Sequence, residues 1–95
     1  MPATQTTEFT QAVEQSRKLK AKPTDNELLE LYGLYKQGTQ DPPFEKSEAA
    51  GMFDFKGKAK RSAWEKVNQA GTSAEDAQKQ YVELVNKLVE KYGSL

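Results

Sequence analysis

The sequence predicts an all-α protein built as a bundle of four helices. Four stretches repeat apolar residues at the spacing of one helical face, and capping or helix-ending residues separate them. No stretch of useful length alternates apolar and polar residues with a period of two, so we expect no sheet. Because 95 residues suit one domain rather than two, we expect residues 1–95 to form a single domain.

The first helix is expected at about residues 7–20 and the second at about residues 25–38. The first has a weak apolar stripe and ends before Pro23, whose ring cannot continue a helix. The second opens with Thr24 and Glu27, which can form a reciprocal capping box. Its apolar face then follows at helical spacing, as Leu28, Leu31, Tyr32 and Tyr35.

The third helix is expected at about residues 55–70 and the fourth at about residues 74–92. Asp54 is a candidate cap for the third helix, and Gly71 ends it. The fourth helix has the clearest stripe in the chain, formed by Tyr81, Leu84, Val85, Leu88, Val89 and Tyr92.

The lengths of the connections predict the order of helix directions. Short links make the first and second helices antiparallel, and likewise the third and fourth. The break from Thr39 to Phe53 is long enough for the second and third helices to run the same way, which gives an up-down-down-up bundle. The apolar end of this break, Met52–Phe55, suggests that the loop returns to pack on the body of the protein.

Composition excludes several classes of function. Because 14 basic residues balance 14 acidic ones, a general nucleic-acid binder is disfavoured. The chain has no cysteine and no histidine, so the usual nucleophile, general base and metal ligands are missing. We expect a non-enzyme without catalytic residues, metal or cofactor. A polar N-terminus, the lack of cysteine and the lack of a long apolar run predict a cytoplasmic protein without signal peptide or stable membrane insertion.

A basic segment runs from Asp54 to Arg61. Lys56 and Lys60 are four residues apart, so in a helix they share a face. The segment can simply be a solvated helix start. Cations at a helix N-terminus oppose the macrodipole, however, and Gly57 permits close approach of a ligand phosphate to the backbone.

Tyrosines form the second candidate feature. Tyr32, Tyr35 and Lys36 fall at i, i+3 and i+4, so two phenols and an ammonium group share a helical face. They can bind a base and a phosphate, or the rings can be half-buried parts of the core. Tyr81, at the start of the last stripe, has the same two interpretations.

Five blocks, in order along most of the chain, resemble the acyl-CoA-binding protein family. They are Lys20–Asp25, Leu31–Gln37, Gly51–Lys60, Ala63-Trp64 and Gly71–Ala77. The resemblance implies a four-helix bundle in up-down-down-up order that binds a CoA head group at its rim and an acyl chain inside. The sequence differs from the family pattern at three positions, with Arg17 for lysine, Arg61 for an aromatic residue and Val13 for alanine. Two of its connections are also longer than is usual in the family.

The resemblance also implies the ligand-binding residues. Tyr32 and Lys36 would meet the CoA phosphates, and Tyr35 the adenine. The remaining implied ligand contacts come from four elements: Arg17, Gly33, Leu34, Lys56, Lys60 and Tyr81.

The resemblance leads to the function that we expect: a monomeric intracellular carrier and pool former for medium- to long-chain fatty acyl-CoA thioesters. Its partners would be long-chain acyl-CoA and, transiently, acyl-CoA-using enzymes or membranes, but not nucleic acid. Three alternatives stay open: a protein-interaction bundle, an acyl-CoA hydrolase and a phosphate or nucleic-acid binder.

Overall fold

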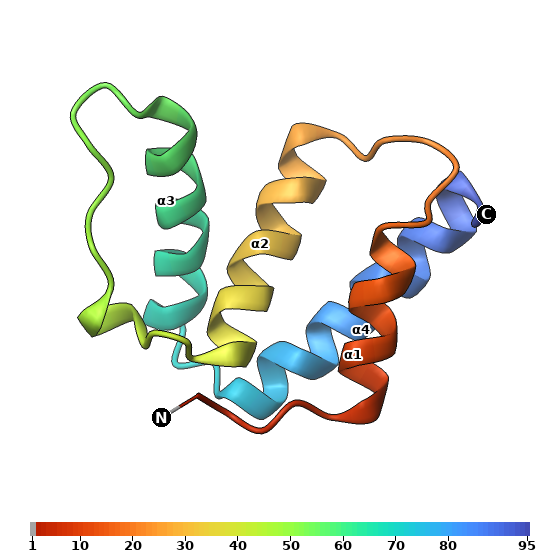
Figure 1. Ribbon diagram of the computed structural model, residues 1–95, viewed down its shortest axis with the longest axis horizontal. Coiled ribbons are helices and arrows are strands. Elements are labelled where there is room, and N and C mark those ends of the chain that lie inside the picture. The colour runs from red at the N-terminus through yellow and green to blue at the C-terminus, as the bar shows by residue number, and fades with distance from the viewer. Residues whose placement is uncertain (1) are drawn as a thin grey trace.

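The computed structural model describes residues 2–95 and contains four α-helices and one short 3₁₀ helix. The helices are α1 (Thr7–Ser16), α2 (Asp25–Thr39), α3 (Phe55–Gln69) and α4 (Ala74–Tyr92), and the 3₁₀ helix η1 (Phe44–Lys46) lies between α2 and α3. Figure 1 shows α1 and α4 running upward and α2 and α3 running downward, which confirms the expected up-down-down-up order. Within residues 2–95 no strand forms, so the all-α prediction is also confirmed.

The helices form an open, flat arrangement rather than a square bundle. Helix α4 packs against α1 and α2, while α2 packs against α3, so α3 joins the body mainly through α2 (Figure 1). The molecule measures 36 × 31 × 19 Å. The core lies where α1, α2 and α4 meet, and its buried apolar residues are Phe9, Ala12, Leu31, Leu34, Ala77, Tyr81, Val85 and Leu88.

Capping side chains begin α2 and α3 where the sequence predicts them, and a serine caps α4. The Thr24–Glu27 capping box is complete, with the Thr24 N–H donating to Glu27 Oε1 over 2.8 Å. Asp54 caps α3 by accepting the Gly57 N–H at 2.9 Å, and Ser73 caps α4 by accepting the Asp76 N–H at 3.1 Å. Each cap satisfies a backbone donor that has no partner within its helix.

The predicted end of the first helix is wrong by one turn. Helix α1 stops at Ser16 instead of Lys20 because the following residues pair with the C-terminal segment. The Lys20 N–H donates to Gly93 O at 3.0 Å, and the Leu95 N–H donates to Lys18 O at 2.7 Å. These bonds use backbone groups that a continued helix would need for itself.

The expected packing of Met52–Phe55 on the body is also wrong. Met52, Phe53 and Phe55 are all strongly exposed, and the loop contacts α3 through Phe44 instead. The Phe44 ring packs edge-on against Trp64 at 5.0 Å between centroids, and the Arg61 guanidinium lies 4.4 Å from the Phe44 centroid. Arg61 also donates to Glu48 O at 3.1 Å, so it holds this loop against α3.

A buried glutamine joins three segments of the chain. The Gln78 amide donates to Gly38 O and to Thr4 O, each at 2.9 Å, and its Oε1 accepts the Thr6 N–H at 2.9 Å. The side chain therefore ties the N-terminal segment and the end of α2 to α4. No helix of residues 2–95 is both long enough and apolar enough to span a bilayer.

An ion pair joins the start of α2 to the end of α4. Glu27 accepts hydrogen bonds from Tyr92 Oη and, at 3.0 Å, from Lys91 Nζ. Hydrogen bonds to the carboxylate lower the pKa of Glu27 from 4.5 to about 2. The bond from Tyr92 has the largest effect, the Thr24 N–H comes next, and Lys91 and the Thr24 hydroxyl contribute less, while burial opposes the shift. A carboxylate with a lowered folded-state pKa stabilises the fold above its unfolded pKa, and this stabilisation disappears as pH falls through the folded value.

Glu27→Gln should therefore lower the free energy of unfolding at pH 7, and the difference from the parent protein should shrink between about pH 4.5 and pH 2. Urea unfolding at a series of pH values measures this difference. Glu90→Gln, at an exposed position on α4, is the matched control. A difference that does not change across this pH range would contradict the role of the Glu27 charge.

Candidate functional site

Helices α2 and α3 touch closely at Gly33, and this contact positions the candidate site. A Cβ at residue 33 would lie 2.8 Å from Ala63 O and 3.3 Å from Trp64 N, both backbone atoms that cannot rotate away. Only glycine therefore allows the observed approach of the two helices. As a result, side chains of α2 and α3 that lie one helical turn from Gly33 can reach each other.

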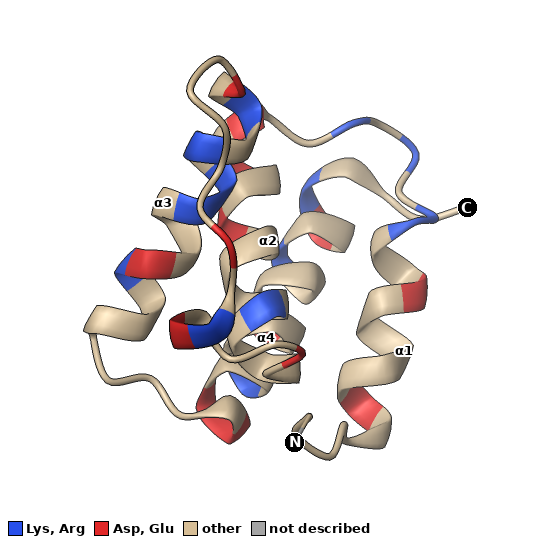
Figure 2. Ribbon diagram, turned by 60° about the vertical axis from the view of Figure 1, so that its left-hand side comes forward, with Lys and Arg blue, Asp and Glu red and all other residues tan. Residues whose placement is uncertain are grey.

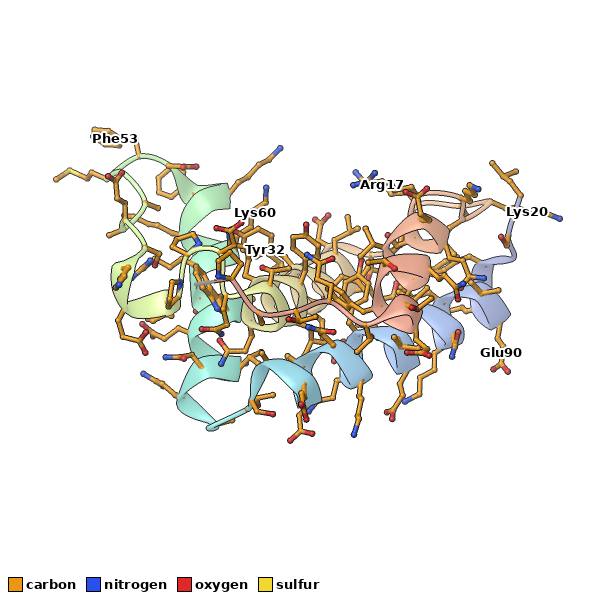
Figure 3. The ribbon with its side chains drawn as sticks, turned by 60° about the horizontal axis from the view of Figure 1, so that its bottom comes forward. Arg17, Lys20, Tyr32, Phe53, Lys60 and Glu90 are labelled. Carbon is orange, nitrogen blue, oxygen red and sulfur yellow. The ribbon has the colours of Figure 1, made fainter. Side chains whose placement is uncertain are left out.

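The side chains that meet there are cations and aromatic rings from both helices. Lys60 Nζ of α3 lies 5.5 Å from the centroid of the Tyr32 ring of α2, and Lys36 Nζ of α2 lies 5.2 Å from the Trp64 ring of α3. Arg17 and Lys60 project on the side of the molecule opposite α4, with Tyr32 below Lys60 (Figure 3). The structure thus gathers Tyr32, Lys36 and Lys60 at one rim.

Three aromatic rings pack together where α1, α2 and α4 meet. Tyr35 stacks on Phe9 of α1 with 5.9 Å between centroids, and Tyr81 of α4 meets Phe9 edge-on at 5.0 Å. The Tyr81 hydroxyl donates to Ser16 Oγ at 3.3 Å. Burial raises the pKa of Tyr81 above its usual value, although the hydrogen bond with Ser16 acts the other way.

Arg17 lies at the end of α1. It is the C-cap residue of that helix, and its side chain is exposed. Its charge acts in the opposite direction to burial on the Tyr81 pKa, so the guanidinium lies within electrostatic reach of the phenol.

An apolar cavity of about 440 Å³ opens between the first turns of α2 and α3. This volume lies within the range of about 300–1,000 Å³ that is typical of small-molecule sites. Charged side chains border the cavity and apolar ones line it: Lys22, Asp25, Lys56 and Lys60, with Leu28, Leu29, Phe55 and Ala59. The predicted sharing of a face by Lys56 and Lys60 is confirmed at this cavity.

Sequence reasoning did not assign Lys22, Leu28, Leu29 or Phe55 to the site. A signal was present, because Asp25, Leu28, Leu29 and Tyr32 follow at i, i+3, i+4 and i+7 and so share one face of α2. We assigned Leu28 to the apolar face of the second helix without a ligand role, and both leucines are half-buried at the cavity, outside the buried core.

Two predicted ligand residues, Gly33 and Leu34, lie on other faces of α2 than Tyr32. At 100° per residue, Leu34 lies about 200° around α2 from Tyr32, and its side chain is buried in the core. Gly33 faces the α3 backbone, so it spaces the helices. The ligand role of both residues stays a prediction.

The glycine at position 57 has a different explanation from the one that the sequence suggested. A Cβ on Gly57 would collide with the Asp54 carboxylate, and the Gly57 N–H already donates to that carboxylate. A phosphate at this helix terminus would have to displace a negative charge. The cap, rather than close approach by a ligand, thus accounts for glycine here.

The cations are concentrated at one end of the molecule. Residues 17–22 and 56–61 each contain four cations and no acidic residue, which makes eight of the 14 cations in the chain. Figure 2 shows the basic residues of the α1–α2 connection and of the first half of α3 together at the top of the view. Although the net charge is zero, this end can attract a polyanion.

The groups gathered at the site can bind a ligand. Among the described residues, no group of three histidine, cysteine, aspartate or glutamate side chains is placed to hold a metal ion. What the site offers is an array of ammonium groups and phenols beside an apolar cavity. The fold and site therefore define a small helical binding protein for a ligand with an anionic end and an apolar end.

Known proteins agree with this class. The family model described as "Acyl CoA binding protein" matches residues 6–85. The acyl-CoA-binding protein homolog 1 of Caenorhabditis elegans is 46% identical over 89 residues, covering 94% of this chain and 99% of its own. The acyl-CoA-binding protein homolog of Manduca sexta is 47% identical over 89 residues, covering 90% and 92%.

A solved structure shows the same fold. The crystal structure of Oryza sativa acyl-CoA-binding protein 2 superposes with a TM-score of 0.77 at 34% identity, covering 88% of this chain and 89% of the rice chain. The chain therefore belongs to the acyl-CoA-binding protein family.

Proposed function

We propose that the protein binds medium- to long-chain fatty acyl-CoA thioesters and serves as an intracellular carrier and pool former that does no chemistry on them. One observation supports this proposal above all others. Lys60 of α3 lies over the Tyr32 ring of α2 and, together with Lys56, also lines the apolar cavity. A thioester of CoA has the matching form, because a phosphate-bearing head is joined to a hydrocarbon chain.

In this proposal the CoA head group binds at the rim. Lys36, Lys60 and Arg17 would bind the phosphates, and Tyr35 would lie against the adenine. A charge-assisted hydrogen bond contributes about 1.5–3 kcal/mol. Stacking of a base on an aromatic ring contributes about 1–3 kcal/mol. Lys56 would add positive charge for the head group, and Tyr81 would contact the ligand from α4.

In the same proposal the acyl chain is buried in the apolar cavity. Burial of about a dozen methylene groups at about 0.8 kcal/mol each is favourable by roughly 10 kcal/mol before costs. Ordering of the ligand and of the surrounding side chains opposes a large part of this. Leu28, Leu29 and Phe55 provide the apolar surface against which the chain would lie.

Alanine at Lys36 or Lys60 should weaken binding of palmitoyl-CoA about tenfold each, because each loses one charge-assisted contact that water partly screens. Isothermal titration calorimetry at two salt concentrations measures the affinity and the loss of salt dependence. Lys66→Ala, on the same helix as Lys60, is the matched control.

Chromatography of the thioester after incubation with the protein should recover it intact, whereas loss of thioester would indicate a hydrolase. Parent-like affinity in both the Lys36 and Lys60 variants would contradict the head-group assignment. A melting temperature unchanged by palmitoyl-CoA would instead favour a protein-interaction bundle.

A further inference from the structure

The loop before α3 ends in a tip of exposed apolar side chains. Met52, Phe53 and Phe55, here called the loop tip, are exposed to 74%, 81% and 72%. Figure 3 shows Phe53 at the outer end of the loop, pointing away from the body of the protein. Three large apolar side chains exposed within four residues call for an apolar partner.

Hydrogen bonds hold the loop tip in a defined shape. Lys58 Nζ donates to Met52 O at 2.8 Å, the Asp54 N–H donates to Gly51 O at 3.1 Å, and the Asp54 carboxylate caps α3. The apolar side chains are therefore presented outward by a turn that is anchored to the helix. Such ordering lowers the entropy cost of docking.

The surroundings of the loop tip are cationic. Residues 51–61 contain four cations and one acidic residue, Asp54, whose carboxylate faces the N-terminus of α3. The basic residues of the α1–α2 connection lie at the same end of the molecule (Figure 2), and Asp25 is the acidic residue that α2 contributes to the cavity wall. An apolar tip within a cationic surround complements an anionic lipid surface.

The loop tip is also continuous with the apolar cavity. Phe55 belongs to the tip and lines the cavity together with Leu28, Leu29 and Ala59. An acyl chain leaving a bilayer at this tip would thus meet the exposed Phe55 ring, which is part of the cavity wall.

We propose that the loop tip inserts into the interface of anionic phospholipid membranes, with the neighbouring lysines on the lipid head groups, and that this contact loads the cavity from the bilayer. The membrane contact stands on the tip and its charges alone, whereas the loading step rests on the proposed function. A stable protein interface uses about 20–30 residues on each side. Interfacial binding needs only a few apolar side chains together with nearby cations.

Sedimentation with vesicles tests the membrane contact on the full chain without acyl-CoA. The parent protein should bind vesicles of phosphatidylcholine with 30% phosphatidylserine, should bind pure phosphatidylcholine vesicles far less, and should be released by salt. Met52→Ser with Phe53→Ser should lower the partition coefficient about tenfold, because the inserted apolar surface is lost. Leu95→Ser, at another strongly exposed apolar position, is the matched control.

Calorimetry with palmitoyl-CoA in solution separates this proposal from the proposed function. Neither Met52 nor Phe53 lines the cavity, so the double variant should keep the parent affinity. Failure of the parent protein to bind anionic vesicles, with palmitoyl-CoA binding intact, would overturn the membrane proposal alone and point to a protein partner. Parent-like vesicle binding by the double variant would overturn it too. Vesicle binding without palmitoyl-CoA binding would overturn the proposed function and leave the membrane contact standing.

Discussion

Phe9→Ala should lower the free energy of unfolding by about 3–5 kcal/mol, the typical cost of removing a fully buried phenylalanine. The Phe9 side chain is completely buried, and its ring contacts both Tyr35 and Tyr81. Since a small domain has a total stability of only about 5–15 kcal/mol, this change removes a large part of it. Urea unfolding monitored by circular dichroism measures the loss.

The chain contains a matched control for this substitution. Phe53 is 81% exposed, so Phe53→Ala deletes the same atoms without leaving a cavity. Its effect on the free energy of unfolding should stay within about 0.5 kcal/mol. Similar losses at the two positions would contradict the placement of Phe9 in the core. Because Phe9 supports two tyrosines of the site, its replacement should also weaken palmitoyl-CoA binding in protein that remains folded.

Features controlled by neighbouring residues could be predicted from the sequence. The capping box at Thr24 and the caps at Asp54 and Ser73 depend on side chains three residues from their partners. Periodicity places the helical faces in the same way, so Tyr32, Lys56 and Lys60 could be chosen before their surroundings were known. The helix directions followed from the lengths of the connections.

Features that depend on distant residues could not be predicted in this way. Helix α1 ends early because Lys18 and Lys20 pair with Gly93 and Leu95. The position of the long loop depends on Phe44 and Arg61, whereas its most apolar residues stay in solvent, a reversal of what hydrophobicity alone suggests. Likewise, nothing local to Gln78 reveals that its amide joins the N-terminal segment to α2.

The site was predicted in its parts but not in its shape. The cations and tyrosines could be identified by type and spacing, and the family resemblance supplied their roles. The close helix contact at Gly33 is a three-dimensional fact, and so is the cavity beside Leu28 and Leu29. Leu34 and Tyr32 lie in one sequence block but on nearly opposite faces of α2, and Leu34 is buried in the core.

The division of the ligand into two ends leads to the prediction with the largest effect on affinity. Free CoA keeps the phosphates and adenine but loses the hydrocarbon, so it should bind at least about a thousandfold more weakly than palmitoyl-CoA. Palmitate keeps the hydrocarbon but loses the contacts to Lys36 and Lys60. At about 1.5–3 kcal/mol for each contact, it should bind at least about a hundredfold more weakly.

Calorimetric titration of the parent protein with palmitoyl-CoA, CoA and palmitate compares the three affinities under one set of conditions. Tight binding of the intact thioester and weak binding of either fragment is the result expected from a cationic rim beside an apolar cavity. If palmitate bound as tightly as its thioester, the rim of Tyr32, Lys36 and Lys60 would have no part in recognising the ligand.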